Sequence, residues 1–264
     1  MYAPKDSQGP IVPVRFDLNS NFTFSCGKDS ACFTKCCRNI KIMLTPYDII
    51  MMKKELGLTS DEFLFLFTEP GLIAATELPI PILKVMDEEI RACPFLKETG
   101  CSIYSVRPLT CRYYPLGAGI FHNRDASSDE RFFAMIKEPH CLGHLSEREW
   151  TVREWIENQG INRYEEVNAG WVGLILKRKS LGPFVDISEK TLQMFFMACY
   201  NIDAFRRFVF ESRFLDIYIV PKERQEEIIA DDVSALDFGV KWLETTLLGS
   251  RNFSIRQYST DAID

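Results

Sequence analysis

Eight of the nine cysteines in this 264-residue chain lie before residue 145, and this distribution constrains the fold more than any other feature. Two of them, Cys36 and Cys37, are adjacent, and adjacent residues rarely meet the geometry of a relaxed disulfide. An odd number of cysteines also argues against a disulfide framework, so metal binding explains the clustering better. The ninth cysteine, Cys199, follows Phe195 and Met197 on the apolar face of an expected helix and is predicted to pack in a core.

The composition describes a chain that does not need a metal merely to compensate for a small core, since 46% of its residues are hydrophobic. The net charge is −6 and no basic block is present, so nothing indicates a nucleic-acid partner. The N-terminus lacks the apolar segment of a secretory signal, and the most apolar stretch, residues 192–220, contains six charged side chains. We therefore expect a cytoplasmic protein with no nucleic-acid partner and no membrane association.

Capping signals predict two helices after the first cysteines. The first should run from a cap at Thr45 to Glu55 and end at Gly57. The second should open at Thr59 and stop at the pair formed by residues 70–71. Short strands are expected at 78–86, pairing with the run into residue 93, and in a hairpin formed by 120–122 and 131–136.

Beyond residue 145 the pattern is helical. Ser146 with Glu149, and Asp186 with Glu189, read as helix caps, and residues 188–218 and 224–248 read as amphipathic helices. The fold class expected is α+β, mostly α. Its predicted parts are an extended N-terminal lead-in at 1–21, a small irregular cysteine-rich metal-binding domain with short hairpins at 22–145, and a helical C-terminal region at 146–264.

The cysteines form two groups whose spacing suits metal ligation. Zinc ligands commonly lie two to four residues apart, with sulfur about 2.3 Å from the metal, and iron–sulfur clusters place a similar demand on cysteine runs. The expected cofactor is an iron–sulfur cluster or zinc, in two four-ligand sites or in one site with spare thiols. Adjacent side chains seldom both ligate one metal, so Cys36 and Cys37 are alternatives to each other. The candidate ligands are Cys26, Cys32, Cys36, Cys37, Cys93, Cys101, Cys111 and Cys141.

Other residues near the cysteines have two interpretations. Arg38, Arg107 and Arg112 could surround the metal centre, offset its negative charge and donate N–H bonds to sulfur, or they could pair with acids such as Asp48 and Glu88. His140 and His144 flank Cys141 and could make a mixed sulfur–nitrogen site, whereas His122 is expected to be structural. The polar residues to consider around a pocket, or as packing beside the centre, are Tyr104, Tyr113, Tyr114 and Asp48.

These motifs together resemble the YkgJ-type cysteine-cluster family, a zinc- or iron-chelating domain named for a CxxCxxCC motif. The likeness covers about residues 22–145, and its most specific string is Arg-Pro-x-x-Cys-Arg-x-Tyr-Pro at 107–115. The first spacing here, Cys-x5-Cys-x3-Cys-Cys, is longer than the motif that names the family. The resemblance strengthens residues 93, 101 and 111 as ligands.

Three functions follow as expectations. The first is a metal-binding protein whose centre serves a redox, metal-handling or structural role. The second is a metal-dependent modifying enzyme, because the flagellin lysine N-methylases resemble this domain, although no glycine-rich S-adenosylmethionine loop is present. The third is a structural zinc protein with an interaction surface on its C-terminal helices. Its expected partners are a metal ion and a protein or substrate bound through those helices.

Overall fold

The structure is a computed structural model that describes residues 11–85, 91–123, 128–180, 187–248 and 254. Its helices outnumber its strands, which agrees with the expected α+β class with helices predominating. The chain divides into two compact units. We name Met1–Ile42 with Lys84–Tyr164 the cysteine unit, and Met43–Leu83 with Glu165–Asp264 the helical unit. All eight candidate cysteines fall in the cysteine unit, although Met43–Leu83 separates them along the chain.

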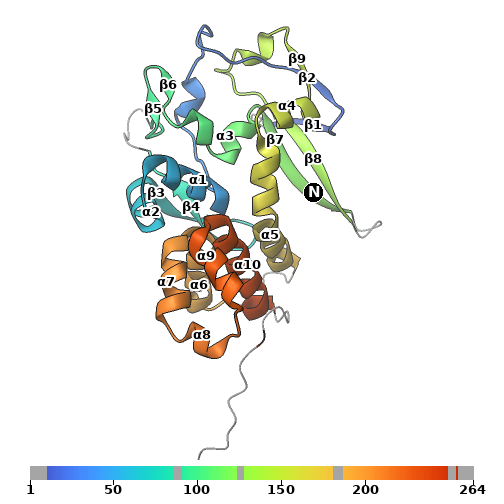
Figure 1. Cartoon of the computed structure of the whole chain (residues 1–264). Helices are drawn as coiled ribbons and strands as arrows, with labels where there is room; N and C mark the ends of the chain where they lie inside the picture. The colour runs from blue at the N-terminus through green and yellow to red at the C-terminus, as the bar shows by residue number, and fades with distance from the viewer. Residues whose placement is uncertain (1–10, 86–90, 124–127, 181–186, 249–253, 255–264) are drawn as a thin grey trace, which may run out of the picture. The chain divides into compact units, whose positions relative to one another are not determined.

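A three-stranded antiparallel sheet of order β1-β8-β7 dominates the cysteine unit (Figure 1). Strands β7, Leu116–Asn123, and β8, Ser128–Ile136, form the hairpin expected from the sequence; β7 is longer than predicted at both ends, and β8 begins earlier but ends at Ile136 as predicted. Strand β1, Ile11–Phe16, pairs with β8. Residues 124–127 of the predicted connecting loop lie outside the described residues.

Smaller elements complete the cysteine unit. Strand β2, Asn21–Thr23, pairs with β9, Glu149–Thr151, and β5, Leu96–Lys97, pairs with β6, Gly100–Cys101. The helices are α3, Leu109–Tyr113, and α4, Val152–Asn158. The predicted Ser146 cap is wrong, because Thr151 and Glu154 form the capping box and a strand precedes it. The core consists of Phe22, Phe24, Tyr113, Leu116, Phe133, Met135, Val152, Trp155, Ile156 and Ile161.

The two predicted helices of the helical unit are confirmed. Helix α1, Pro46–Leu56, has the Thr45 capping box and ends at Gly57, whose φ of 66° is left-handed and suits glycine. Helix α2, Ser60–Phe67, has the Thr59 capping box. The predicted stop at 70–71 is wrong, because these residues lie inside β3, Thr68–Ile73. Strand β3 pairs with β4, Leu78–Leu83, so the expected pairing of β4 with the run into Cys93 is also wrong.

The remaining helices belong almost wholly to the helical unit. Helix α5, Ile161–Ser180, contributes only its first turn to the cysteine unit. The helix expected at 188–218 is three helices, because the chain breaks at Asn201 and again after Glu211, and that expected at 224–248 is two. Ser188 caps the first of these, and Asp186 lies outside the described residues. Their bounds are α6, Glu189–Tyr200; α7, Ile202–Glu211; α8, Phe214–Ile217; α9, Lys222–Ala230; and α10, Asp232–Leu248.

Aromatic and aliphatic side chains fill the core of the helical unit. Cys199 is fully buried there, as predicted, beside the fully buried Phe195 and Tyr200. The Trp171 indole N–H donates to the Tyr200 hydroxyl over 3.0 Å, which satisfies a buried polar pair. Among the described residues, no helix combines the length and the apolar character that crossing a bilayer requires.

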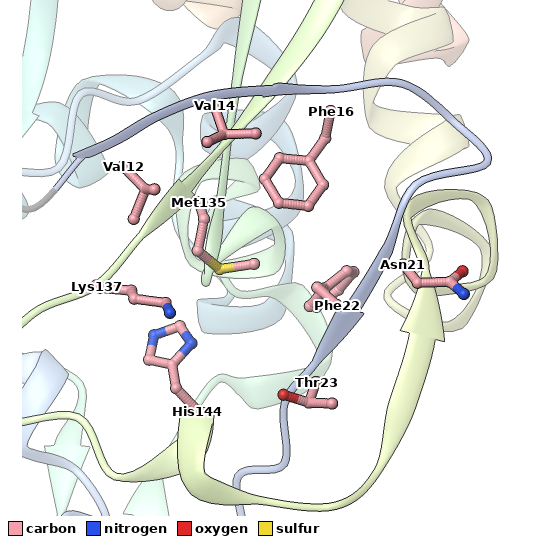
Figure 2. Close-up of a pocket in the computed structure, with 9 residues that line it drawn as sticks. All are labelled: Val12, Val14, Phe16, Asn21, Phe22, Thr23, Met135, Lys137 and His144. Atoms are coloured by element: carbon pink, nitrogen blue, oxygen red, sulfur yellow. The ribbon is translucent and has the colours of Figure 1, made fainter.

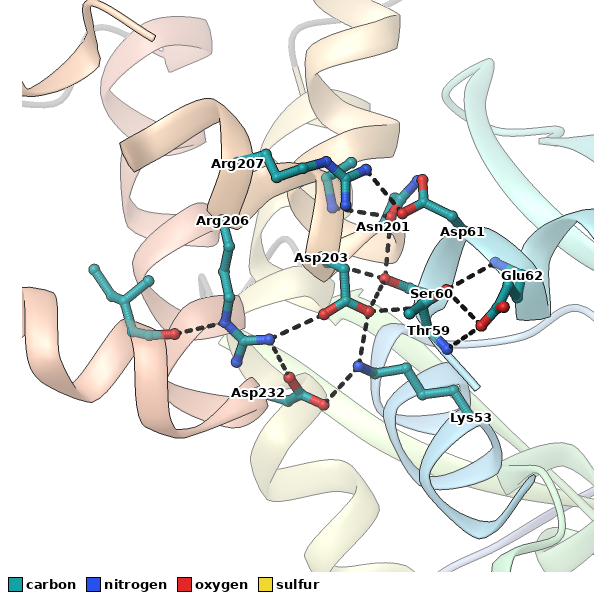
Figure 3. A network of polar contacts seen from close by, with 12 residues as sticks. Lys53, Thr59, Ser60, Asp61, Glu62, Asn201, Asp203, Arg206, Arg207 and Asp232 are labelled. Atoms are coloured by element: carbon teal, nitrogen blue, oxygen red, sulfur yellow. Dashed lines mark hydrogen bonds and ion pairs between the residues drawn. The ribbon is translucent and has the colours of Figure 1, made fainter. Parts of the chain in front are cut away.

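A buried ion network joins helices of this unit (Figure 3). Lys53 Nζ lies 3.0 Å from Asp203 Oδ2 and 3.0 Å from Asp232 Oδ2. Arg206 bridges the same two carboxylates from the other side, at 3.2 and 2.6 Å. Ser60 donates its amide and its hydroxyl to Asp203 over 2.7 and 2.8 Å. The network therefore links α1, α2, α7 and α10 through two acids and two bases.

Acid should weaken the helical unit through Asp203. Burial by itself raises the pKa of this carboxyl, but the Ser60 amide, Lys53 and the Ser60 hydroxyl together lower it to about 2. Because the pKa is lower folded than unfolded, the stabilisation is complete above about pH 4 and is lost as the pH falls toward 2. We expect the difference in unfolding free energy between wild type and Asp203→Asn to shrink by about 2 kcal/mol between pH 5 and pH 2. Urea denaturation of both proteins at both pH values measures this change. A difference in unfolding free energy that stays constant between the two pH values would contradict the prediction.

Candidate metal centre

The candidate cysteines occupy loops, turns and short elements of the cysteine unit. None of the nine cysteines forms a disulfide. Apart from Cys26, which is exposed, and Cys32, which is buried, the candidate cysteines are partly buried. Their positions are Cys26 after β2, Cys32 in a turn, Cys36 and Cys37 in the 3₁₀ turn Lys35–Cys37, Cys93 before β5, Cys101 in β6, Cys111 in α3 and Cys141 after β8.

Main-chain hydrogen bonds fasten the two cysteine groups to each other. The Cys93 amide donates to the Cys37 carbonyl over 2.9 Å, and the Asn39 amide donates to the Arg91 carbonyl over 3.0 Å. Between these bonds, Arg38 and Ala92 form an isolated antiparallel bridge. The segments that carry Cys36–Cys37 and Cys93 are therefore paired side by side.

A second set of contacts attaches the turn after Cys141 to the first group. The Leu142 amide donates to Cys32 Sγ over 3.2 Å, and the Ser30 hydroxyl lies 3.0 Å from the same sulfur. Burial alone raises the pKa of Cys32, but Ser30 and the amides of Leu142 and Gly143 outweigh it, so the pKa is lowered. Amide donors that lower a thiol pKa favour the thiolate, which is the form that binds metals.

Cys36 affects the pKa of thiols in both cysteine groups. Burial, followed by the charges of Cys36, Cys32 and Cys141, raises the pKa of Cys26 to about 11. A hydrogen bond with Cys37 is the largest cause that raises the pKa of Cys36, ahead of burial. The Cys36 charge also contributes to the raised pKa values of two thiols from the second group, Cys93 and Cys101, after burial as the main cause.

These interactions show which predicted ligands the fold brings together. Cys36 is an electrostatic neighbour of Cys26, Cys37, Cys93 and Cys101. Gathering several thiols raises their pKa values, since like charges repel, and a bound cation would remove that repulsion. Soft thiolates suit zinc and iron–sulfur centres, so the donor set fits such a group. Within the described part of the chain, however, no three potential ligands already stand in a coordinating arrangement.

Hydrogen bonds from Arg107 and Arg112 fix the segment that contains Cys111. Arg112 donates to the carbonyls of Arg107 and Gln159 over 3.0 and 2.7 Å, to the Tyr164 hydroxyl over 3.1 Å, and to the Ser105 carbonyl. Arg107 donates to the Tyr104 carbonyl over 2.7 Å. These bonds connect residues 104–112 to the end of α4 and the start of α5.

The arginines differ in their relation to sulfur. Burial lowers the pKa of Arg107, while the neighbouring Cys111 and Cys101 act in the opposite direction, so this guanidinium lies within electrostatic range of two thiols. Arg38 is exposed. Of the acids considered as their partners, Asp48 belongs to the helical unit, where it caps α1, and residue 88 lies outside the described residues. A role for these arginines around a metal stays a prediction.

The tyrosines and histidines occupy distinct places in the cysteine unit. Tyr104 is exposed, whereas Tyr113 is buried and accepts a 2.5 Å hydrogen bond from Arg131. The buried Tyr114 hydroxyl neighbours Cys141, and after burial this contact raises its pKa. His144 Nε2 lies 3.0 Å from the Ile136 carbonyl oxygen. His140 Nε2 lies 3.3 Å from a Glu138 carboxylate oxygen, and the His122 side chain lies outside the described residues.

Sequence reasoning missed the donors that hold Cys32. The amide of Leu142 comes from 110 residues farther along the chain, so no local spacing could reveal it. The only signal was the glycine at 143, whose small size permits the close approach of the two loops. The Gly143 carbonyl accepts a hydrogen bond of 3.1 Å from the amide of Ser25, the residue before Cys26.

Replacing Gly143 by alanine should disturb this centre. A Cβ there would lie 2.5 Å from the Phe24 ring and 2.8 Å from the Ser25 carbonyl oxygen, and Phe24 is buried in the core. We expect Gly143→Ala to lower the unfolding free energy by about 1–3 kcal/mol, as overpacking does. Gly27→Ala is the matched control, since a Cβ at Gly27 meets nothing within 4 Å. Urea denaturation measures both, and equal losses in the two variants would contradict the prediction.

The loops of the cysteine unit bring several thiols into electrostatic range of one another, and thiolates are the ligands that soft metals prefer. Residues 25–141 match the model of the CxxCxxCC family, described as "Putative zinc- or iron-chelating domain". The resemblance expected from the sequence is thus confirmed for residues 25–141. The comparisons with curated proteins and with solved structures gave no significant match.

Proposed function

We propose that the cysteine unit binds an iron–sulfur cluster through thiolates drawn from its eight cysteines, for a redox or metal-handling role. The observation that carries the proposal is the pairing of the segment that contains Cys36 and Cys37 with the segment that contains Cys93, through the 2.9 Å bond from the Cys93 amide to the Cys37 carbonyl and the Arg38–Ala92 bridge. The match of residues 25–141 to the family model supports the coarser statement, chelation of zinc or iron. The cytoplasmic location expected from the sequence is part of the same proposal.

Two features favour a cluster over a single zinc ion. A structural zinc ion is satisfied by four ligands, and eight thiols exceed that number. Main-chain amides also favour the thiolate of two cysteines, since the amides of Phe95 and Leu96 act to lower the pKa of Cys93 and that of Ile103 acts to lower the pKa of Cys101, against burial. Hydrogen bonds to sulfur tune the reduction potential of such clusters.

In this proposal each part of the chain has a defined task. A bound cluster would supply one-electron chemistry, and the protein supplies position and electrostatics. The loops around Cys36 and Cys93 would hold it, the amides facing Cys32 would favour its thiolate, and Arg107 would offset negative charge beside Cys101 and Cys111.

Anaerobic purification with metal analysis tests the proposal. We expect a brown protein with broad absorption near about 400 nm and with iron and sulfide in matching amounts. Cys36→Ala and Cys93→Ala should lose most of the iron, whereas Cys199→Ala should keep it, because Cys199 lies in the core of the helical unit. A colourless protein with stoichiometric zinc would exclude the redox role and leave the coarser chelating function. Unchanged metal in Cys93→Ala would refute the assignment of ligands.

A further inference from the structure

The cysteine unit contains a cavity that the thiol centre does not use. Its volume is about 250 Å³, and it opens between β1, β2 and the end of β8 (Figure 2). This is slightly below the range of about 300–1,000 Å³ that holds drug-sized ligands, so the cavity suits a smaller molecule. Its lining residues are Val12, Val14, Phe16, Asn21, Phe22, Thr23, Met135, Lys137 and His144.

Most of the wall is apolar. Val12, Val14 and Phe16 are alternate residues of β1, and alternate residues of a strand share one face. Met135 and Phe22 are buried at 4% and 6% exposure and complete the wall from β8 and β2. Val14 is 54% exposed, so an apolar side chain stands at the opening of the cavity. Such a wall favours a hydrocarbon ligand over a sugar or another polar molecule.

The two basic side chains of the lining, Lys137 and His144, lie side by side at one end of the cavity, and Asn21 lies at the opposite end (Figure 2). His144 Nε2 lies within hydrogen-bond distance of the Ile136 carbonyl oxygen, and burial lowers the pKa of His144. Lys137 therefore supplies the positive charge. Among the described residues, Lys137 has no hydrogen-bond or ion-pair partner. Among the described residues that line the cavity, none carries a carboxylate that would neutralise it.

We propose that this cavity binds a small carboxylic acid with an apolar tail. The tail would lie among Val12, Val14, Phe16 and Met135, and the carboxylate would pair with Lys137. A single lysine beside a neutral histidine matches one negative charge, which favours a carboxylate over a doubly charged phosphate monoester. This site goes beyond the proposed metal function and does not depend on it.

Titration calorimetry with octanoate tests the site in the full-length protein. We expect saturable binding of one octanoate per chain, with 1-octanol at least fivefold weaker, because the alcohol lacks the charge. Lys137→Gln should weaken octanoate about fivefold, and Val14→Trp should abolish binding by filling the opening. Lys41→Gln is the matched control, since Lys41 is an exposed lysine of the same unit outside the lining, and it should bind like wild type.

A second measurement locates the ligand. The methyl resonance of Met135, assigned with Met135→Leu, should shift on addition of octanoate, because this side chain lies in the wall. Melting temperature and metal content of each variant show that loss of binding is not loss of folding or of the thiol centre. Absence of saturable binding, equal affinity for octanoate and octanol, or an unchanged affinity in Lys137→Gln would each overturn the proposal.

Discussion

Removal of the metal with a chelator is expected to speed amide exchange in the cysteine unit and to leave the helical unit unchanged. The loops around Cys36, Cys93 and Cys141 have few regular elements and are joined by few main-chain hydrogen bonds, so the proposed metal would be their main cross-link. Metal binding to such loops is coupled to their folding. We expect exchange to rise at least tenfold in residues 25–42 and 91–111, as measured by hydrogen–deuterium exchange with mass spectrometry. Each tenfold change corresponds to about 1.4 kcal/mol.

The control for this experiment is Cys93→Ala, which should exchange quickly already and respond little to the chelator. The core of the helical unit, with its buried Phe195, Tyr200 and Phe205, serves as an internal reference. A rise of equal size in both units, or no rise in the cysteine unit of a protein shown to lose its metal, would contradict the prediction.

Lys53→Met is expected to be the most damaging single change in the helical unit. The Lys53 side chain is only 8% exposed, and it contacts both Asp203 and Asp232 at 3.0 Å. Methionine would leave two largely buried carboxylates with Arg206 as their shared base. Breaking a buried ion pair by removing one partner costs about 3–5 kcal/mol, and we expect a loss of this size in urea denaturation.

Lys241→Met provides the comparison. Lys241 pairs with Asp237 at 2.8 Å one turn away on α10, and both side chains are about half exposed. Pairs of this kind contribute about 0–1 kcal/mol. Similar losses in the two variants would show that the buried network carries no special stability.

Local signals predicted the first helices well. At Thr45 and Thr59 the cap and the acid three residues later are near neighbours, so the start of each helix is specified by a few adjacent side chains. The pairing of strands was harder to predict from the sequence. Pro70 and Pro81 lie opposite each other in β3 and β4, and a proline–glycine pair reads as a helix stop unless the partner strand is known.

The breaks in the C-terminal helices have a similar origin. Asn201 ends α6, and its side chain accepts from the Ala204 amide to cap α7. Its amide also donates to Asp61 on α2 over 2.8 Å. Because that contact spans 140 residues, periodicity alone could not distinguish one long helix from two.

For the candidate site, the sequence supplied the cysteines but not their arrangement. The spacing predicts that nearby thiols can converge on a metal, and this stays a prediction; what the fold adds is the pairing of the Cys37 and Cys93 segments. Which thiols face main-chain amides depends on loops from distant parts of the chain, as at Cys32. The cavity beside β1 was not predicted from the sequence, because the β1 side chains become part of its wall only when β1 pairs with β8.

The interleaving of the two units along the chain determines what a newly synthesised molecule can do. Cys26 to Cys37 leave the ribosome first, then Met43–Leu83, then Cys93 to Cys141. Strand β4 must in turn wait for α6, which it contacts. Chains commonly fold from the N-terminus during synthesis, but here neither unit is complete until residues beyond 160 have emerged. The first four thiols therefore leave the ribosome before any cysteine of the second group, and during that interval they lack the thiols with which they would share a metal.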